Sequence, residues 1–178
     1  IVGLFLKDNS LQPILGRLLS DMLVTMTDRG PDSAGIAIYT DKHAGRSKFT
    51  IQSENAERDF QGLPDYLDKH LDCTLDFRIN DTHAVVILDQ SAVSSFSGVL
   101  KAFNPEIRIM SHGLALEIYK EVGLPKQVTK RFQIAKMSGR HGIGHTRMAT
   151  ESAVTTLGAH PFNTGVDQCL VHNGSLSN

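Results

Sequence analysis

Apolar positions near the start of the chain predict a short strand followed by a helix. Residues 1–5 form an apolar run that is typical of a buried strand. From Ser10 onward, apolar residues recur at spacings of three and four, which predicts an amphipathic helix with Ser10 as its N-cap. Because Gly30 and Pro31 cannot continue a helix, we expect it to end near Arg29.

The rest of the chain alternates between strand-like and helix-like patterns. Strands are predicted at 34–40 and 48–52, which would pair as a hairpin, and at 75–79, 83–89, 106–110, 141–150 and 168–172. Helices are predicted at 63–70, 90–103, 114–122 and after Pro125. The alternation over 65–112 predicts a small α/β insertion on a larger core.

Composition indicates one globular domain. The chain has 178 residues, of which 40% are hydrophobic and 21% charged, so it is neither disordered nor membrane-spanning in composition. Its net charge of -1 gives no electrostatic reason to bind nucleic acid or an anionic membrane. The two cysteines, Cys73 and Cys169, form no CxxC pair, which favours a reducing compartment. With no signal-peptide pattern at residues 1–5, we expect a cytoplasmic protein.

Charge is unevenly distributed, and this points to a site near the end of the chain. Residues 139–178 contain four of the eight histidines and six of the fifteen glycines. Charged residues are few in this stretch: Arg140, Arg147, Glu151 and Asp167. A segment poor in charge but rich in glycine and histidine is typical of buried strands and loops around a functional site.

Several motifs have both a structural and a functional interpretation. RGPDSAG at 29–35 fits a Pro-Asp turn between a helix and a strand. His141 and His145 are four apart, but the glycines between them disfavour a helix that would present both to a metal, so ordinary core histidines are the stronger alternative. Cys169 lies in an apolar strand, which favours a buried small residue over a nucleophile.

Arg147 and the Asn173-Gly174 pair carry the most specific chemistry. An arginine at the end of a nearly uncharged strand needs an anion, either a substrate carboxylate or a structural ion-pair partner. The Asn-Gly pair fits a hairpin turn. It also fits an oxyanion hole, in which a side-chain amide and a glycine N–H point at the same developing negative charge.

In sequence order, these motifs resemble the glutaminase domain of the class II, N-terminal-nucleophile glutamine amidotransferases. The family pattern runs C-G-I-[VF]-G, R-G-x-[DE]-S-x-G, G-H-x-R-x-x-T, A-[HQ]-P-F and H-N-G-x-[LI]-x-N. The matching segments here are IVG at 1–3, RGPDSAG at 29–35, GHTRMAT at 144–150, AHPF at 159–162 and HNGSLSN at 172–178. The resemblance covers both ends of the chain, but not the predicted insertion at 65–112.

The resemblance implies an α+β fold, a four-layer αββα sandwich, that hydrolyses L-glutamine to glutamate and ammonia. By position, Arg147 would hold the α-carboxylate of glutamine, and Asn173 and Gly174 would form the oxyanion hole. Thr150 and His160 would line the pocket.

Arg29 would lie in the loop beside the nucleophile. In the family this nucleophile is an N-terminal cysteine, whose own α-amino group is the base and has a pKa of about 7.7 to 8.0. Ile1 aligns with the third residue of the family pattern, and the family continues after the position of Asn178. We therefore expect the domain to be incomplete at both ends, with a Cys-Gly pair before Ile1.

The resemblance also implies a partner. RGPDSAG and GHTRMATES are most similar to amidotransferase subunits of glutamate-synthase-like and N-methylglutamate synthase assemblies, whereas HNGSLSN and HGLALEIY are closer to amidophosphoribosyltransferases. The first similarity implies a hetero-oligomer in which a synthase subunit receives the ammonia. We expect no cofactor or metal in this chain, with FMN and an iron–sulfur cluster in partner subunits. The alternatives are an amidophosphoribosyltransferase-type domain, a catalytically silent scaffold subunit and a histidine-rich metal protein.

Overall fold

The computed structural model describes residues 1–149 and 153–174, which divide into two compact units. The first unit holds Ile1–Asp41, Ile118–Thr164 and the residues from Gln168 onward. The second unit holds Lys42–Glu117 and Gly165–Asp167. The predicted insertion at 65–112 lies within the second unit.

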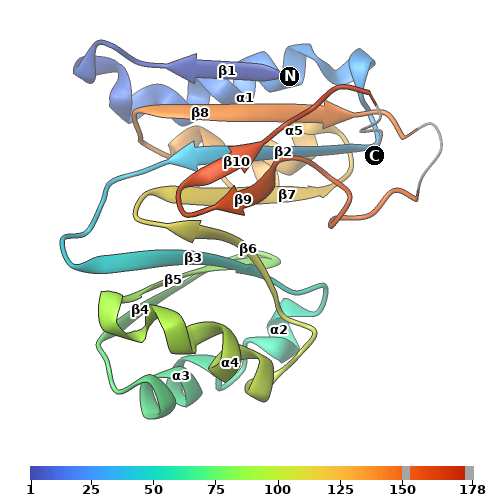
Figure 1. Ribbon diagram of the computed structural model, residues 1–178. Coiled ribbons are helices and arrows are strands. Elements are labelled where there is room, and N and C mark those ends of the chain that lie inside the picture. The colour runs from blue at the N-terminus through green and yellow to red at the C-terminus, as the bar shows by residue number, and fades with distance from the viewer. Residues whose placement is uncertain (150–152, 175–178) are drawn as a thin grey trace. The chain divides into compact units, whose positions relative to one another are not determined.

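The first unit is built on a four-stranded sheet (Figure 1). Its strands, in spatial order, are β1 (Val2–Phe5), β8 (His141–Arg147), β2 (Ser33–Tyr39) and β7 (Leu116–Val122). Both β1 and β2 run antiparallel to β8, with Val2 opposite Gly144 and Ser33 opposite Arg147. The strand predicted at 1–5 is therefore confirmed, and β8 is a central strand that ends at Arg147.

Helices pack on one face of this sheet. They are η1 (Asn9–Ile14), α1 (Leu15–Thr25), η2 (Thr27–Arg29), α5 (Pro125–Arg131) and η4 (Ile134–Lys136). Three leucines of α1, Leu15, Leu19 and Leu23, are fully buried, as the spacing predicted. The predicted start at Ser10 is wrong: η1 comes first, and the Asp8 carboxylate caps it by accepting the backbone N–H of Ser10 at 2.9 Å.

The helix predicted at 114–122 is wrong, because Leu116–Val122 forms the strand β7. All residues of Leu116–Val122 except the last are buried. A helix would bury one face of this segment and expose the other, whereas a sheet strand can bury both. The charged residues of this strand include Lys120, which is buried against backbone carbonyl groups.

The second unit is another antiparallel sheet with helices (Figure 1). Its strands, in order, are β4 (Leu75–Asn80), β5 (His83–Asp89), β3 (Arg46–Gln52) and β6 (Arg108–Gly113). Its helices are α2 (Ala56–Asp59), α3 (Leu63–Leu71), η3 (Gln90–Ala92) and α4 (Val93–Phe103). Apolar residues from both layers form its core, with Ile51, Leu67 and Phe96 fully buried.

The predicted hairpin between 34–40 and 48–52 is wrong, although both segments are strands. β2 pairs with β8 in the first unit, and β3 pairs with β5 and β6 in the second. Alternating patterns identify strands but not partners that are distant in sequence. The architecture is mixed α and β with antiparallel pairing, compatible with the predicted α+β class.

A two-stranded sheet of β9 (Phe162–Gly165) and β10 (Gln168–Leu170) completes the strands described. β10 is shorter than the strand predicted at 168–172. Within residues 1–149 and 153–174, no helix has the length and apolar character needed to cross a membrane.

Candidate functional site

The candidate site lies in the first unit, on the face of the sheet opposite α1. Thr146 of β8 donates its hydroxyl hydrogen to the carbonyl oxygen of Met26, at the end of α1. Because side chains alternate along a strand, the neighbouring His145 and Arg147 point to the other face. His145 is buried, with 7% of its surface exposed, and Arg147 is half-buried.

A buried lysine attaches the loop before β9 to this face. The ammonium group of Lys120 donates to the carbonyl oxygens of Leu157, Ala159 and Pro161 at 3.3, 2.8 and 3.2 Å. It also lies 4.6 Å from the centre of the Phe162 ring. Burial lowers the pKa of Lys120 to about 8. These contacts hold the AHPF segment against β7.

The same loop passes directly over β2. A β-carbon at Gly35 would collide with the carbonyl oxygen of His160, so this close approach requires glycine. Gly35 is also the register partner of His145 on β8. The loop therefore brings His160 over the strand pair that carries His145.

Three histidine rings from three separate motifs meet here. The ring of His160 lies 4.3 Å from that of His145 and 4.4 Å from that of His172, measured between centroids. Phe162 packs edge-on against His160 at 4.5 Å. We call His145, His160 and His172 the histidine cluster. It joins the GHTR, AHPF and HNG segments in space.

Burial keeps two members of the cluster neutral. The pKa of His145 is lowered to about 4, chiefly by burial. Burial is also the main cause that lowers the pKa of His160, to about 3, and Lys120 and Arg147 are among the neighbouring groups that further disfavour its protonated form. Neither ring nitrogen of His160 has a hydrogen-bond partner among the described residues, although only 6% of its surface is exposed. A buried polar group without a partner in the protein needs an explanation, and a binding or catalytic role is one.

A hydrogen bond connects the cluster to the Asn-Gly segment. Nε2 of His145 lies 3.1 Å from the carbonyl oxygen of His172. Nδ1 of His172 lies 2.9 Å from the carbonyl oxygen of Gly174. Asn173 and Gly174 are exposed, and Gly174 has a φ of 92°, a backbone conformation that favours glycine.

The RGPDSAG segment is bonded to the end of β8. The N–H of Asp32 donates to the carbonyl oxygen of Arg147 at 3.1 Å, and its carboxylate accepts the N–H of Ala149 at 2.7 Å. The carbonyl oxygen of Asp32 accepts the N–H of Gly123 at 2.8 Å. Gly30 packs so closely on the Thr146–Arg147 backbone that a β-carbon there would clash. The motif therefore supports the Arg147 strand end in addition to turning the chain.

The structure brings some of the predicted site residues together and leaves others apart. His160 belongs to the histidine cluster, and Arg147 and the Asn173-Gly174 pair lie beside it. Arg29 is exposed in η2, one residue before the tightly packed Gly30. The guanidinium of Arg147 lies 3.5 Å from the carbonyl oxygen of Ala153.

Thr150 lies outside the residues that the structure describes, and so do the last four residues of the HNGSLSN motif. The roles of these residues remain predictions from the resemblance.

Sequence reasoning assigned no role to Lys120, His145 or Asp32. The sequence patterns placed Lys120 on a helix, where a lysine is normally exposed, and His145 was interpreted as an ordinary core histidine rather than a metal ligand. The signal for His145 and Asp32 was their place inside two of the five motifs. Lys120 had no such signal, because its function depends on carbonyl groups about 40 residues away in sequence.

Among the described residues, neither cysteine is hydrogen-bonded to a member of the histidine cluster. Cys169 of β10 has its sulfur 3.6 Å from the hydroxyl oxygen of Tyr39, and burial raises the pKa of its thiol. A raised thiol pKa disfavours the reactive thiolate, which supports the interpretation of Cys169 as a packing residue. Cys73 packs against the core of the second unit. The described residues contain no group of three or more His, Cys, Asp or Glu arranged to hold a metal ion.

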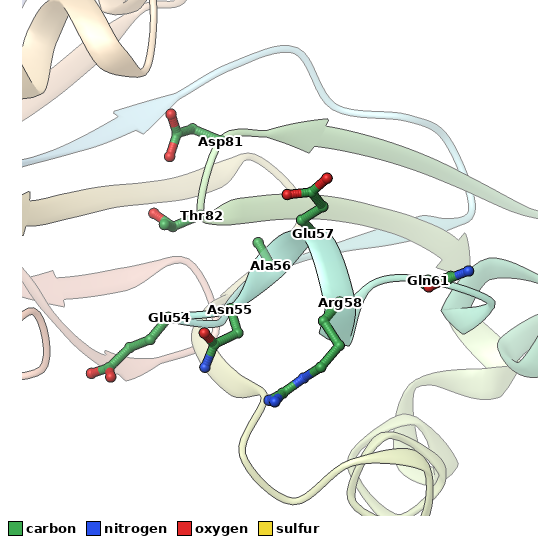
Figure 2. Close-up of a pocket in the computed structure, with 8 residues that line it drawn as sticks. All are labelled: Glu54, Asn55, Ala56, Glu57, Arg58, Gln61, Asp81 and Thr82. Atoms are coloured by element: carbon green, nitrogen blue, oxygen red, sulfur yellow. The ribbon is translucent and has the colours of Figure 1, made fainter.

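A separate surface pocket of about 620 Å³ lies in the second unit (Figure 2). Its lining residues are Glu54, Asn55, Ala56, Glu57, Arg58, Gln61, Asp81 and Thr82. Figure 2 shows the charged side chains pointing in different directions rather than at one centre. The pocket contains none of the residues in the five motifs, so we do not assign the site chemistry to it.

Comparison with known proteins gives relatives over the full chain. It is 60% identical over 179 residues to the glutamine amidotransferase-like protein GlxB of Rhizobium meliloti, covering 100% of this chain and 59% of that protein. It is 28% identical over 192 residues to a putative glutamine amidotransferase of Methanothermobacter thermautotrophicus, covering 100% of this chain and 61% of that protein. The chain thus spans about three fifths of the length of these two relatives.

A shorter similarity extends to a third kind of protein. Over 76 residues, 40% of this chain and 12% of the relative, it is 43% identical to a glutamine–fructose-6-phosphate aminotransferase of Methanosarcina acetivorans. No known protein-family profile matches the chain. The two relatives that match the whole of this chain and the one that matches part of it together support the presence of a glutamine amidotransferase domain in this chain.

Proposed function

We propose that this domain is the glutaminase of a class II amidotransferase, hydrolysing L-glutamine to glutamate and ammonia. The observation that carries the proposal is the convergence of three motif segments on one face of the first sheet. Arg147 ends β8, His160 lies over β2, and His172 bonds to His145 beside the Asn173-Gly174 pair. The amidotransferase-like relatives support the same reaction.

Arg147 is the proposed binding group for the α-carboxylate of glutamine. Its planar guanidinium can donate two parallel hydrogen bonds to one carboxylate. Its strand is held on both sides by β1 and β2, and Asp32 bonds to the carbonyl oxygen of Arg147 itself. A rigid strand end is suited to fixing one end of a small substrate.

Asn173 and Gly174 are the proposed oxyanion hole. A thiolate attacks the amide carbon of glutamine, and the carbonyl oxygen becomes an oxyanion. The Asn173 side-chain amide and the Gly174 backbone N–H would donate to this oxygen, which stabilises the transition state. The α-ammonium group of the N-terminal cysteine, which has taken the thiol proton, donates it to the leaving nitrogen as the tetrahedral intermediate collapses. Ammonia is released and a thioester remains, which water then hydrolyses to glutamate.

The proposed nucleophile is a cysteine two residues before Ile1. The register of β1 supports this position: Val2 lies opposite Gly144, so each earlier residue in the same register lies opposite the next residue of β8. A cysteine two residues before Ile1 would then lie opposite Arg147. The nucleophile and the carboxylate-binding residue would be neighbours on adjacent strands.

We also propose the four-layer αββα sandwich as the complete fold. What supports it is that each unit has one four-stranded sheet with antiparallel pairing and helices packed beside it.

The proposed cellular location is the cytoplasm, where reducing conditions keep a catalytic thiol free.

The proposed partner is a synthase subunit that receives the ammonia, of the glutamate-synthase-like or N-methylglutamate synthase kind, in a hetero-oligomer. We assign FMN and an iron–sulfur cluster to that partner. Co-purification of a flavin-containing subunit with the natural protein would support this assignment, and a partner without flavin would contradict it.

A direct assay tests the proposed reaction. The natural full-length protein, with its partner present, is incubated with L-glutamine, and glutamate and ammonia are both measured. We expect equal amounts of the two products, and loss of both when the proposed nucleophile is changed from Cys to Ser. No glutamate formation would contradict the proposal and indicate a scaffold subunit. Activity that survives the Cys-to-Ser change would contradict the proposed nucleophile.

A further inference from the structure

We infer that His145 is a positioning residue for the oxyanion hole, because it holds the peptide group that precedes Asn173. This inference rests on the proposed glutaminase function and deepens it. His145 would not touch the substrate. It would act through the backbone of the segment that carries Asn173 and Gly174.

The direction of the hydrogen bond follows from its chemistry. Nε2 of His145 lies 3.1 Å from the carbonyl oxygen of His172. Since a carbonyl oxygen can only accept, Nε2 must carry the hydrogen. Nδ1 of His145 is buried and has no hydrogen-bond partner among the described residues. The ring is therefore assigned as the neutral Nε2–H tautomer.

The bonded carbonyl belongs to the peptide unit that joins His172 to Asn173. A peptide unit is planar, so fixing its C=O also fixes the N–H on the other side and the starting direction of the next residue. The Asn173 side chain and the Gly174 N–H must converge on one oxygen to form an oxyanion hole. Fixing the peptide plane before Asn173 therefore constrains the geometry of the oxyanion hole.

His145 is a rigid support for a segment that is otherwise exposed. It lies in a central strand, opposite Gly35 of β2, and its ring packs on that of His160 at 4.3 Å. His160 also packs on His172, at 4.4 Å. Asn173 and Gly174, in contrast, are exposed. Catalytic groups on loops are positioned well only when rigid elements support them.

This geometry separates the expected effect on turnover from the effect on substrate binding. Arg147 lies two residues further along β8 and is held by the backbone pairing of that strand, which a side-chain change at 145 does not remove. We therefore expect replacement of His145 to lower kcat and leave KM nearly unchanged. Removing an oxyanion-hole donor lowers kcat by about 10²–10³-fold, so loosening the hole should cost about tenfold or more.

The test compares two variants at 145 with one control, all in the full-length natural protein with its partner. His145→Phe removes the N–H donor and keeps an aromatic ring against His160. His145→Gln restores an N–H donor near the position of Nε2. His141→Gln is the matched control, since His141 lies on the same face of β8 but stacks on Tyr39 at 3.9 Å.

We expect His145→Phe to lose at least tenfold in kcat with KM within about threefold of wild type. His145→Gln should recover much of that loss, and His141→Gln should match wild type. In ¹⁵N-histidine spectra, His145 should show hydrogen on Nε2, with a signal shifted by hydrogen bonding.

A wild-type kcat in His145→Phe, a loss expressed mainly in KM, no recovery in His145→Gln, or hydrogen on Nδ1 would overturn the inference. An equal loss in His141→Gln would also overturn it, because the effect would then be general to the strand. These outcomes all require an active wild-type protein. An inactive wild type would instead refute the proposed function, so the two failures are distinguishable.

Discussion

The ammonium nitrogen of Lys120 lies 2.8 Å from the carbonyl oxygen of Ala159, in an interior where only 4% of the lysine surface is exposed. Two further carbonyl oxygens, of Leu157 and Pro161, surround the same nitrogen. This lysine attaches the loop that carries His160 to β7. The contact connects the stability of the protein to the geometry of the candidate site.

Because of Lys120, the free energy of unfolding should increase with pH in alkaline solution. Its pKa is about 8 when folded and 10.5 in its ordinary state. Between these values the unfolded chain binds more protons, so the free energy of unfolding rises with pH. The rise should reach about 3 kcal/mol by pH 10.5 relative to pH 8, and it should be missing in Lys120→Met. Chemical denaturation of both proteins across this range measures the difference, and parallel curves would contradict the assignment.

Two members of the histidine cluster should destabilise the protein in acid. The pKa values of His145 and His160 are about 4 and 3, both lowered from 6.5 chiefly by burial. The unfolded chain therefore binds more protons as pH falls below 6.5, and stability is lost progressively toward pH 4. Each histidine should account for about 2 kcal/mol between pH 7 and 5. His160→Gln should remove one such contribution from the loss of unfolding free energy in acid.

Replacing Arg147 by lysine should weaken glutamine binding. Lysine keeps the positive charge but cannot make two parallel hydrogen bonds to a carboxylate. We expect KM for glutamine to rise about tenfold or more, corresponding to a loss of about 1.4 kcal/mol or more. Arg140→Lys serves as the control because Arg140 is exposed and packs over the Phe5 ring at 5.0 Å. Steady-state kinetics of both variants decide the matter, and an unchanged KM in Arg147→Lys would refute its assigned role.

Asp32 should influence glutamine binding through the segment that follows Arg147. Its carboxylate accepts the N–H of Ala149 at 2.7 Å. Asp32→Ala leaves that N–H without its acceptor, a loss of about 1–3 kcal/mol, and KM should rise at least about fivefold. Asp32→Asn keeps an acceptor oxygen and should lie closer to wild type. Asp21→Ala, at an exposed position of α1, should leave KM unchanged. Equal KM values in all three variants would contradict the proposed role of Asp32.

Local sequence patterns predicted the elements that are stabilised by regular burial. Leu15, Leu19 and Leu23 recur every four residues and form the buried face of α1. β7 was missed because Lys120 and Glu121 are buried there, while sequence patterns assume that charged residues face solvent. The partner of β3 was also missed, since neither β5 nor β6 is adjacent to it in sequence.

The candidate site was predictable to the extent that its chemistry lies in motifs. Arg147, His160 and Asn173 were identified from motif order, and the structure places their segments around one histidine cluster. The contribution of Lys120 could not be predicted, because backbone carbonyl groups of any sequence can accept its hydrogen bonds. The His145–His172 bond likewise depends on the path of the backbone rather than on residue type.

The central claim is that a cysteine two residues before Ile1 attacks glutamine beside Arg147. The most direct test treats the natural full-length protein with a glutamine analogue that carries an electrophilic carbon in place of the amide, followed by peptide mass spectrometry. We predict one label per chain, on that cysteine, prevented by excess L-glutamine. Labelling at Cys73 or Cys169, or no labelling of a protein that has the cysteine, would contradict the account.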